Sequence, residues 1–442
     1  MTEFANINSV SKDFMCCNCG ACIAICPKDC ITIEKSNIGR YYAKADSDCI
    51  NCGKCLKTCP IVDSQDNREK DELSDNKIKE SYIGKSCCHQ IFSNSQSGGA
   101  TTAILTYLFQ SKQIEAALLC ISDKGIPQAA IITSAEELYK SQKSKYTPVS
   151  LLSEAKKLLK YSSAAIVGLP CHIDGVCSII ENSEKYRSII KFKLGLICDR
   201  TLCEGIIDSF CSYIKLSERP SEIYWRAKGN INGKFYNYLD SPVVFTDGSG
   251  KNHIIPKRAR MALKEMFTPP RCRICYNKLN TNADIVLGDP WGLEGTDYTN
   301  GSSLIIVRSN IGECVIKECT EKSYLKIDKN IRAEEVEKSQ NMAGRVVSVL
   351  SYLPALKRYF HSNNQYHFGK IKEIAIPKKE RILANKKIAD FIDSEKKSCD
   401  DIANRAYKIL RREKLKRKSK IFAYFYRLKN TLSLLFWYFK TI

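Results

Sequence analysis

The first 60 residues carry the same cysteine pattern twice, C-x2-C-x2-C-x3-C followed by a proline. The pattern predicts two 4Fe-4S clusters, because each run supplies three thiolates from one loop and a fourth that ligates the other cluster. We expect one cluster on Cys16, Cys19, Cys22 and Cys59 and the other on Cys49, Cys52, Cys55 and Cys26. Zinc is the alternative, but its ligands usually come as separated C-x2-C pairs. Because such clusters carry single electrons, the rest of the chain must supply or receive them.

The chain has 442 residues, enough for two or three domains, and contains 23 cysteines. A secreted disulfide scaffold would also be rich in cysteine, but the N-terminal sequence MTEFANINSVSKDF has no apolar segment that directs secretion. We therefore expect a reducing, cytoplasmic location. The sequence shows no run of about 18 apolar residues, so we expect no helix that spans a membrane.

Composition and periodicity divide the chain into four parts. Residues 1–62 form the predicted ferredoxin-like domain, and residues 63–80 read as a charged linker. Residues 81–333 alternate strand and helix patterns, which predicts an α/β core with a hairpin at 229–233 and strands at 116–121, 129–133, 164–168, 189–198, 283–288 and 304–308. Ser134 and Glu137 predict a capping box at a helix start. Residues 334–442 form a basic helical extension, so the fold class is α+β followed by α/β with a helical tail.

Residues 96–102 are the first candidate binding segment in the core. Ser97, Gly98, Gly99 and Thr101 lead directly into a helical pattern. Backbone amides and the helix dipole at such a turn can hold a nucleotide phosphate. Taken alone, a turn that merely caps a core helix is the simpler explanation.

Four scattered cysteines are the second candidate. Cys171 and Cys198 follow strand patterns, and α/β folds place their sites at strand ends. Cys272 and Cys275 add a C-x2-C pair, which alone would fit half a zinc site or a dithiol. Together the four make one complete thiolate set, so we predict a third 4Fe-4S cluster.

The order of these motifs resembles the coenzyme F420 hydrogenase/dehydrogenase beta-subunit family. The resemblance covers about residues 15–320 and rests on the cysteine runs and on Ser97–Gly99, Ser144–Tyr146, Gly168–Cys171, Leu194–Cys198, Cys272–Cys275 and Ala283–Asp289. It implies an α/β core that binds FAD through Ser97, Gly98, Gly99, Thr101, Lys145 and Tyr146. It also implies a 4Fe-4S cluster beside the flavin, held by Cys171, Cys198, Cys272 and Cys275.

The resemblance implies several activities. Some members oxidise or reduce coenzyme F420, others pass electrons from ferredoxin to an organic substrate, and bacterial members occur in surface-polysaccharide gene clusters. We expect an iron-sulfur flavoprotein oxidoreductase that takes electrons from ferredoxin or a reduced coenzyme and reduces an organic substrate, with surface-polysaccharide biosynthesis as a setting. The alternatives are a coenzyme F420-dependent hydrogenase or dehydrogenase beta subunit and a non-catalytic electron-relay subunit.

Two residues depart from the family pattern. His172 stands where glutamine is expected, and Cys203 lies five residues beyond Cys198, so either could change the cluster ligands or the proton supply. For His172, a hydrogen-bonded polar residue at a helix start is the simpler explanation. The remaining cysteines fit buried apolar positions, among them Cys17, Cys30, Cys87, Cys88 and Cys120.

The C-terminus combines positive charge with an apolar stripe. Residues 403–442 hold 12 Lys or Arg and one Glu, a large share of the net charge of +21. Helical spacing aligns six apolar residues near Trp437 and Tyr438, namely Ile421, Phe425, Leu428, Leu432, Leu435 and Phe439. We expect this helix to lie on an anionic membrane surface, with packing on the core or on another subunit as the alternative. We expect no nucleic acid partner, since the stripe would then have no role.

Overall fold

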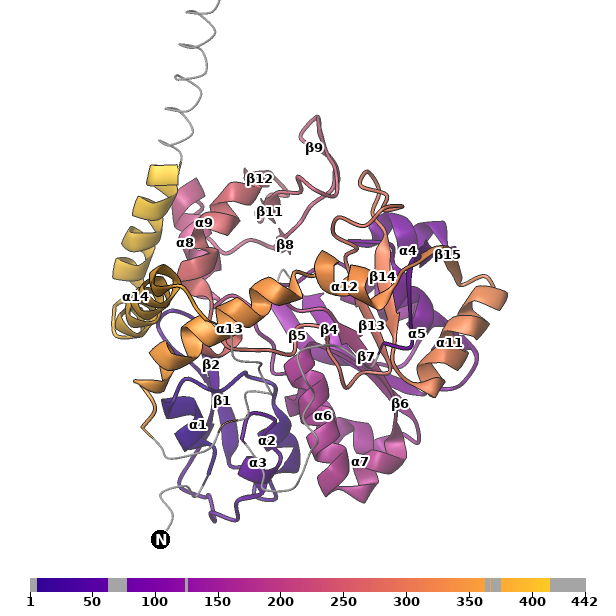
Figure 1. Cartoon of the computed structure of the whole chain (residues 1–442), viewed down its shortest axis with the longest axis horizontal. Coiled ribbons are helices and arrows are strands. Elements are labelled where there is room, and N and C mark those ends of the chain that lie inside the picture. Colours follow the sequence, from indigo (N-terminus) through magenta and orange to yellow (C-terminus); the bar gives the residue numbers. More distant parts are fainter. Residues whose placement is uncertain (1–5, 63–77, 124–125, 362–365, 367–374, 414–442) are drawn as a thin grey trace, which may run out of the picture.

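The computed structural model describes residues 6–62, 78–123, 126–361, 366 and 375–413. Its centre is an eight-stranded mixed sheet in the order β15-β3-β14-β13-β7-β6-β4-β5 (Figure 1). The strands are β3 (Glu80–Ser86), β4 (Ala116–Asp123), β5 (Ile126–Ile132), β6 (Ala164–Gly168), β7 (Ile190–Leu196), β13 (Ile285–Gly288), β14 (Ser303–Val307) and β15 (Leu325–Asn330). Neighbours β4, β6, β7 and β13 are parallel, and the outer pairings are antiparallel. The six predicted core strands are all confirmed.

Both faces of the sheet are covered, which explains why its central strands are apolar along their whole length. Ile166 of β6 packs with α6 (Pro170–Asn182) and the 3-10 helix η2 (Leu151–Lys160). The next residue, Val167, points to the opposite face and packs with α5 (Ala100–Gln110) and α11 (Asn310–Glu321). Alternate residues of one strand therefore serve two separate cores.

The ferredoxin-like unit repeats its geometry as it repeats its sequence. It contains α1 (Asn8–Lys12), α2 (Ala21–Ile25), α3 (Lys54–Lys57) and the antiparallel pair β1 (Ile31–Lys35) and β2 (Tyr41–Ala45). Gly20 and Gly53 follow the second cysteine of each run, and both are left-handed, with φ of 87° and 71°. They start α2 and α3, so each loop turns into its helix at the same point.

Smaller elements complete the core. A three-stranded sheet contains β8 (Glu222–Tyr224), β11 (Val243–Thr246) and β12 (Asn252–Ile255), and the predicted hairpin is β9 (Gly229–Ile231) with β10 (Lys234–Tyr236). The remaining core helices are α4 (His89–Asn94), η1 (Ala135–Ser141), α7 (Glu184–Ile189), α8 (Gly205–Ile214), α9 (Lys257–Phe267) and α10 (Pro270–Arg273). The predicted capping box is wrong, because Ser134 starts a 3-10 helix without a side-chain cap and its hydroxyl meets the Glu136 carboxylate instead.

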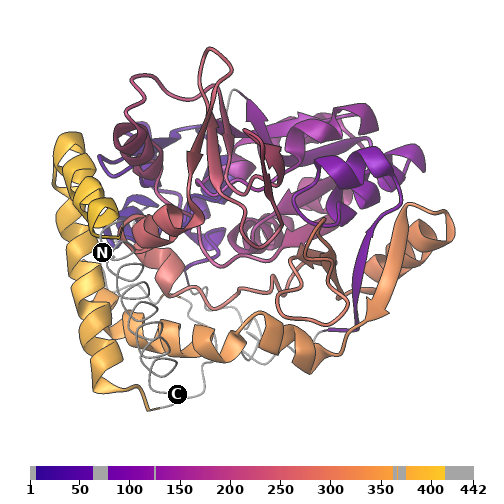
Figure 2. The ribbon, with the colours of Figure 1, turned by 90° about the horizontal axis from the view of Figure 1, so that it is seen from above.

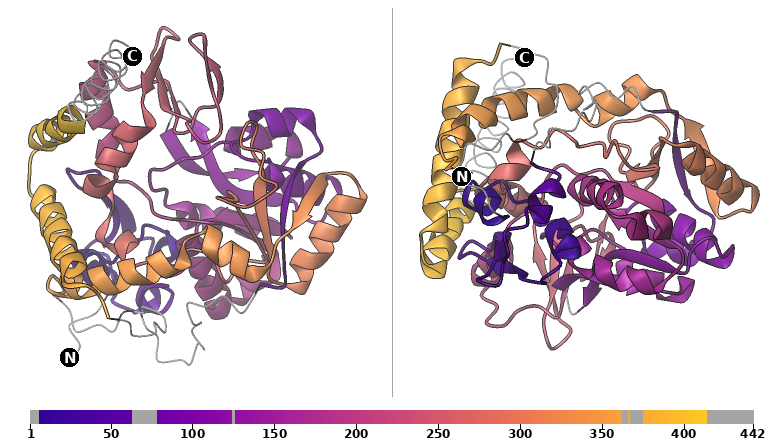
Figure 3. Two further views of the ribbon diagram at one scale, coloured as in Figure 1. Left: turned by 45° about the horizontal axis from the view of Figure 1, so that its top comes forward. Right: turned by 90° about the horizontal axis from the view of Figure 1, so that it is seen from below.

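The C-terminal extension is mainly helical within the residues that the structure describes. It contains α12 (Ala333–Ser339), α13 (Met342–Lys357), α14 (Lys378–Glu395) and a helical segment at 399–413. Figures 2 and 3 show α13 and α14 wrapped around one side of the molecule, beside the ferredoxin-like unit. Glu395 of α14 pairs with Arg40 of that unit at 2.8 Å, so the extension holds the unit in place.

The predicted apolar stripe, from Ile421 to Phe439, lies outside the described residues. The same holds for most of the predicted charged linker, residues 63–77. Within the described ranges, no helix has the length and apolarity needed to cross a bilayer.

Candidate functional site

The main cavity lies at the carboxyl edge of the parallel strands. It has a volume of about 620 Å³, within the range that holds small ligands and cofactors. Gly168, Leu196 and Gly288 line it, and each is the last residue of its strand, β6, β7 and β13. Open α/β sheets bind ligands at this edge, because loops of several strands converge there.

Five of the six predicted flavin residues line this cavity, namely Ser97, Gly99, Thr101, Lys145 and Tyr146. Gly98 lies behind it, where a Cβ would stand 2.6 Å from the carbonyl oxygen of Gly84. Its amide donates to Ser303 Oγ at 3.1 Å, so this glycine serves the packing of the turn. Gly99, with φ of 79°, starts α5 and aims the first turn of the helix at the cavity.

Lys145 and Tyr146 form a fixed part of the wall. Lys145 Nζ donates hydrogen bonds of 2.8, 2.9 and 3.1 Å to the carbonyls of residues 141–143. Burial lowers the pKa of Lys145 to about 8. The Tyr146 ring lies 4.8 Å from the Arg260 guanidinium and 5.7 Å from the ring of Trp225. The loop therefore presents an aromatic and a cationic surface together.

Asp289 and Arg226 form a buried ion pair in the same wall, and only Asp289 belonged to a motif recognised in the sequence. Their side chains are 2.6 Å apart, and the Ser97 hydroxyl donates to the other Asp289 oxygen. Arg226 is 6% exposed and contacts the rings of Tyr238 and Trp291. Burial alone would lower the pKa of Arg226, but the Asp289 carboxylate outweighs it and raises that pKa.

The cavity is strongly basic. Among the described residues that line it, Asp199 and Asp289 contribute the only carboxylates, against Lys143, Lys145, Arg200, Arg226, Lys257, Arg260, Lys264 and Lys278. Helix α9 supplies Lys257, Arg260 and Lys264 at positions i, i+3 and i+7, so they share one face. Five of the cations form no ion pair within the part of the chain that the structure describes, namely Lys143, Lys145, Lys257, Arg260 and Lys278. Such a wall favours a ligand with several negative charges.

A second, smaller cavity gathers the four cysteines predicted for the core cluster. Cys171, in the first turn of α6, and Cys198, just beyond β7, meet Cys272 of α10 and Cys275. Burial and the neighbouring Cys272 and Cys275 thiols raise the pKa of Cys198. Four convergent thiols fit the ligand demand of a 4Fe-4S cluster, which deprotonates them on binding. Cys17 lines this cavity too, although we expected it to be an ordinary apolar residue.

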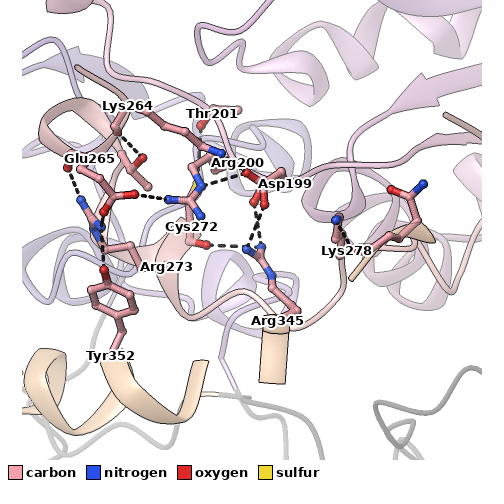
Figure 4. Close-up of polar contacts among 12 residues, drawn as sticks. Asp199, Arg200, Thr201, Lys264, Glu265, Cys272, Arg273, Lys278, Arg345 and Tyr352 are labelled. Carbon is pink, nitrogen blue, oxygen red and sulfur yellow. Dashed lines mark hydrogen bonds and ion pairs between the residues drawn. The ribbon is translucent and has the colours of Figure 1, made fainter. Parts of the chain in front are cut away.

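The two cavities share a wall. Both are lined by Val149, Leu169, His172, Cys198, Asp199, Arg200 and Thr201. Figure 4 shows how ion pairs hold part of this wall, with Arg200 bridging Asp199 at 3.1 Å and Glu265 at 3.2 Å. Arg345 of α13 donates to the backbone carbonyl of Asp199 at 2.9 Å. Burial would raise the pKa of Asp199, but Arg200, Lys264 and Arg345 hold it well below its usual range.

The ferredoxin-like unit brings cysteines of its two runs close together. Cys26 of the first run lines one small cavity with Cys49, Cys52 and Cys55 of the second. Cys59 of the second run lies near Cys22 of the first run. Burial and the neighbouring thiols of Cys16 and Cys59 raise the pKa of Cys22. The Ala43 amide donates to Cys16 Sγ at 3.4 Å, and Asn6 donates to Cys49 Sγ at 3.6 Å. Such donors are typical of cluster-ligating sulfurs.

His172 is a satisfied buried residue. Its Nδ1 accepts from the Leu169 amide at 3.2 Å, and its Nε2 lies 3.1 Å from the Val149 carbonyl, which it reaches as a donor. Burial lowers the pKa of His172 to about 4, so the ring is neutral and fixed. Both of its nitrogens are engaged by the backbone, which favours the simpler explanation given above.

The other cysteines have mixed positions. Cys203 is fully buried in the hydrophobic core and does not line the cluster cavity, and Cys30 is buried beside Cys26. Cys120 is half-buried at the main cavity. Cys87 and Cys88 are exposed before α4, so the expectation that they are buried is wrong. Strand β3 ends at Ser86, directly before these two cysteines, and the chain leaves the sheet there.

Comparison with known proteins identifies related sequences. Models of the coenzyme F420 hydrogenase/dehydrogenase beta subunit match residues 81–156 with their N-terminal part and residues 161–333 with their C-terminal part. A 4Fe-4S dicluster domain matches residues 15–62. One subunit of the F420H2 dehydrogenase of Methanosarcina mazei is 28% identical over 329 residues, which is 70% of this chain and 83% of that protein.

Two further proteins extend the comparison. The coenzyme F420-dependent sulfite reductase of Methanocaldococcus jannaschii is 23% identical over 76% of this chain, which spans only 50% of that protein. A chain of the F420-reducing NiFe hydrogenase complex from Methanosarcina barkeri aligns with a TM-score of 0.47 and 16% identity, over 66% of this chain and 92% of that one. On the strength of the matched domains, this chain belongs to the coenzyme F420 hydrogenase/dehydrogenase beta-subunit family and carries a 4Fe-4S dicluster domain.

Proposed function

We propose that this chain is an iron-sulfur flavoprotein that exchanges electrons between its 4Fe-4S clusters and coenzyme F420, with FAD in the main cavity. The shared wall between the two cavities carries this proposal. A cluster held by the four core cysteines would adjoin a flavin in the main cavity through residues 198–201. FAD, when bound, would supply the conversion between one-electron and two-electron chemistry.

The flavin part of the proposal rests on the first turn of α5. Thr101 and Thr102 line the cavity in a turn whose amides have no intrahelical acceptors, which suits a phosphate group. Ser97 is held by Asp289, and Asp289 by Arg226, so the entry to this turn is rigid. The Tyr146 ring, which packs against Trp225 and Arg260, offers a surface on which a planar ring can stack.

The choice of partner rests on charge and on the relatives. The basic face of α9 and the nearby Lys278 suit a second ligand that is itself anionic, such as a deazaflavin with an acidic side chain. Relatives whose names include coenzyme F420 support this alternative over the organic substrate that we favoured from sequence. These relatives are not named for polysaccharide biosynthesis, so that setting receives no support from them.

An anaerobic assay of the reconstituted protein tests the proposal. Protein loaded with iron, sulfide and FAD is mixed with reduced coenzyme F420, and reduction of the clusters is followed by absorbance and by electron paramagnetic resonance. We expect cluster reduction with reduced F420 that depends on FAD, and little with NADH or NADPH. Cluster reduction that is equal without FAD would contradict the flavin, and no reduction by F420 in fully loaded protein would contradict the partner.

Thr101→Asp separates flavin binding from folding. An acidic residue in the first turn favours the helix but repels a phosphate at the same place. We expect the variant to fold, keep its iron and lose FAD affinity by at least about tenfold, while Thr101→Val stays within about threefold because it adds no charge. Equal FAD affinity of the two variants would show that the phosphate does not lie at this turn.

A further inference from the structure

Arg260 of α9 is a buried cation without an anionic partner. It lines the main cavity and is only 8% exposed. Within the described residues, its Nε has no hydrogen-bond partner, and no carboxylate pairs with its guanidinium. Burial of an unpaired charge is costly, and an anion that enters the cavity and pairs with the guanidinium offsets this cost. Arg260 is therefore suited to bind an anionic group of a ligand.

The other two arginines that line the main cavity differ from Arg260. Arg200 pairs with Asp199 at 3.1 Å, and Arg226 pairs with Asp289 at 2.6 Å. Both charges are thus balanced by carboxylates of the protein itself. Of the three arginines at this cavity, Arg260 alone keeps its charge for a ligand, as far as the structure describes the chain.

The surroundings of Arg260 hold its side chain in place. The guanidinium lies 4.8 Å from the centre of the Tyr146 ring, and that ring packs against Trp225. Lys257 and Lys264 lie about one turn before and after Arg260 on the same face of α9. Each of these lysines donates a hydrogen bond to another part of the cavity wall. The basic face is therefore ordered without a ligand, which lowers the entropic cost of binding one.

The position of α9 separates this anion site from the flavin phosphate of the proposed function. Helices α9 and α5 lie well apart in Figure 1, although residues of both line the main cavity. One phosphate cannot contact both helices, so a flavin phosphate at Thr101 leaves Arg260 to a second ligand. The planar guanidinium pairs best with a carboxylate or a phosphate, because either can accept two parallel hydrogen bonds.

We propose that Arg260 binds the acidic side chain of the second ligand and thereby selects coenzyme F420 over deazaflavins that lack this chain. The inference rests on the proposed function for the identity of that ligand. Lys257 and Lys264 add electrostatic attraction on both sides of the contact. Arg260 thus determines specificity, while the deazaflavin ring itself can bind without it.

The test compares Arg260→Gln and Arg260→Lys with the parent and with Arg258→Gln as a matched control. Arg258 belongs to the same helix, two residues away, but is exposed. Each full-length protein is loaded with iron, sulfide and FAD, and its iron and FAD contents are measured. Equilibrium dialysis then gives its affinity for oxidised coenzyme F420 and for the same deazaflavin without the acidic side chain. Oxidised ligand and oxidised protein exchange no electrons, so the assay reports binding alone.

We expect Arg260→Gln to weaken binding of coenzyme F420 at least about tenfold, because hydrogen bonds to a charged group are lost. Its affinity for the truncated deazaflavin and its FAD and iron contents should match the parent. Arg260→Lys should recover part of the loss, and Arg258→Gln should bind like the parent. Without ligand, Arg260→Gln should melt no lower than the parent, since it removes a buried unpaired charge.

Three results would overturn the role of Arg260 and leave the proposed function intact. These are an unchanged affinity of Arg260→Gln for coenzyme F420, an equal loss for both deazaflavins, and a loss of FAD, which would place the flavin phosphate at Arg260. A parent protein that binds neither deazaflavin would instead contradict the coenzyme F420 partner of the proposed function, and this proposal with it.

Discussion

The Asp289–Arg226 ion pair should be the most sensitive polar contact of the main cavity. Asp289→Asn removes the carboxylate 2.6 Å from a guanidinium that is only 6% exposed, and no other carboxylate among the described residues pairs with that guanidinium. Removing one partner of a buried pair costs 3–5 kcal/mol, and we take about 3 kcal/mol because Asp289 keeps some solvent contact. For a core of this size, that corresponds to a fall of roughly 6–12 °C in apparent melting temperature.

A double-mutant cycle isolates the pair. Arg226→Met removes the charge but fills the same space between Tyr238 and Trp291, where a thioether packs well. In the protein that carries both substitutions, no buried charge is left unpaired at this position, so we expect most of the loss from Asp289→Asn to be recovered. Melting is measured by circular dichroism on anaerobic, cluster-loaded protein of each variant.

A matched control is the exposed pair Lys79–Glu313, with a similar distance of 2.8 Å but side chains 39% and 48% exposed. Glu313→Gln should change the free energy of unfolding by less than about 1 kcal/mol, because water screens the pair. Losses that simply add in the double variant would refute the reasoning, as would a shift from Asp289→Asn no larger than that of Glu313→Gln.

Three further predictions address the clusters, the buried histidine and the C-terminus. Cys272→Ser should lower the iron content from about twelve to about eight atoms, whereas Ser at the exposed Cys399 should leave it unchanged; equal iron in both would contradict the third cluster. Because burial lowers the pKa of His172 to about 4, the unfolded chain binds more protons between about pH 6.5 and 4, so stability falls as pH falls through that window. His172→Gln should remove this dependence in thermal melts, and an unchanged slope would count against a neutral ring. Finally, full-length protein should sediment with anionic liposomes in a salt-sensitive way and a version ending at Glu413 should not; equal sedimentation would exclude the C-terminal segment as an anchor.

Features that depend on spacing within one segment were predictable from the sequence. Two four-cysteine runs predict their own loops, and the same Gly follows the second cysteine of each, so both loops turn identically. The six core strands were also predictable, because continuous apolar runs such as 164–168 mark a sheet that is buried on both faces. The four core cysteines were selected from two strand ends, one C-x2-C pair and the order of the motifs. The fold brings all four to one cavity.

The side to which neighbouring residues face follows from how distant segments pack. Cys16 and Cys17 have the same chemistry and adjacent positions, but packing of the loop on α6 and η2 sends them to different sites. Gly98 looked equivalent to Gly99 in sequence, and yet it packs on β3 while Gly99 meets the cavity. Arg226 carries no motif at all, and its role follows from the distant Asp289, Tyr238 and Trp291. Local spacing fixes the geometry within one turn, whereas the burial and the electrostatic surroundings of a residue depend on segments that meet only in the folded chain.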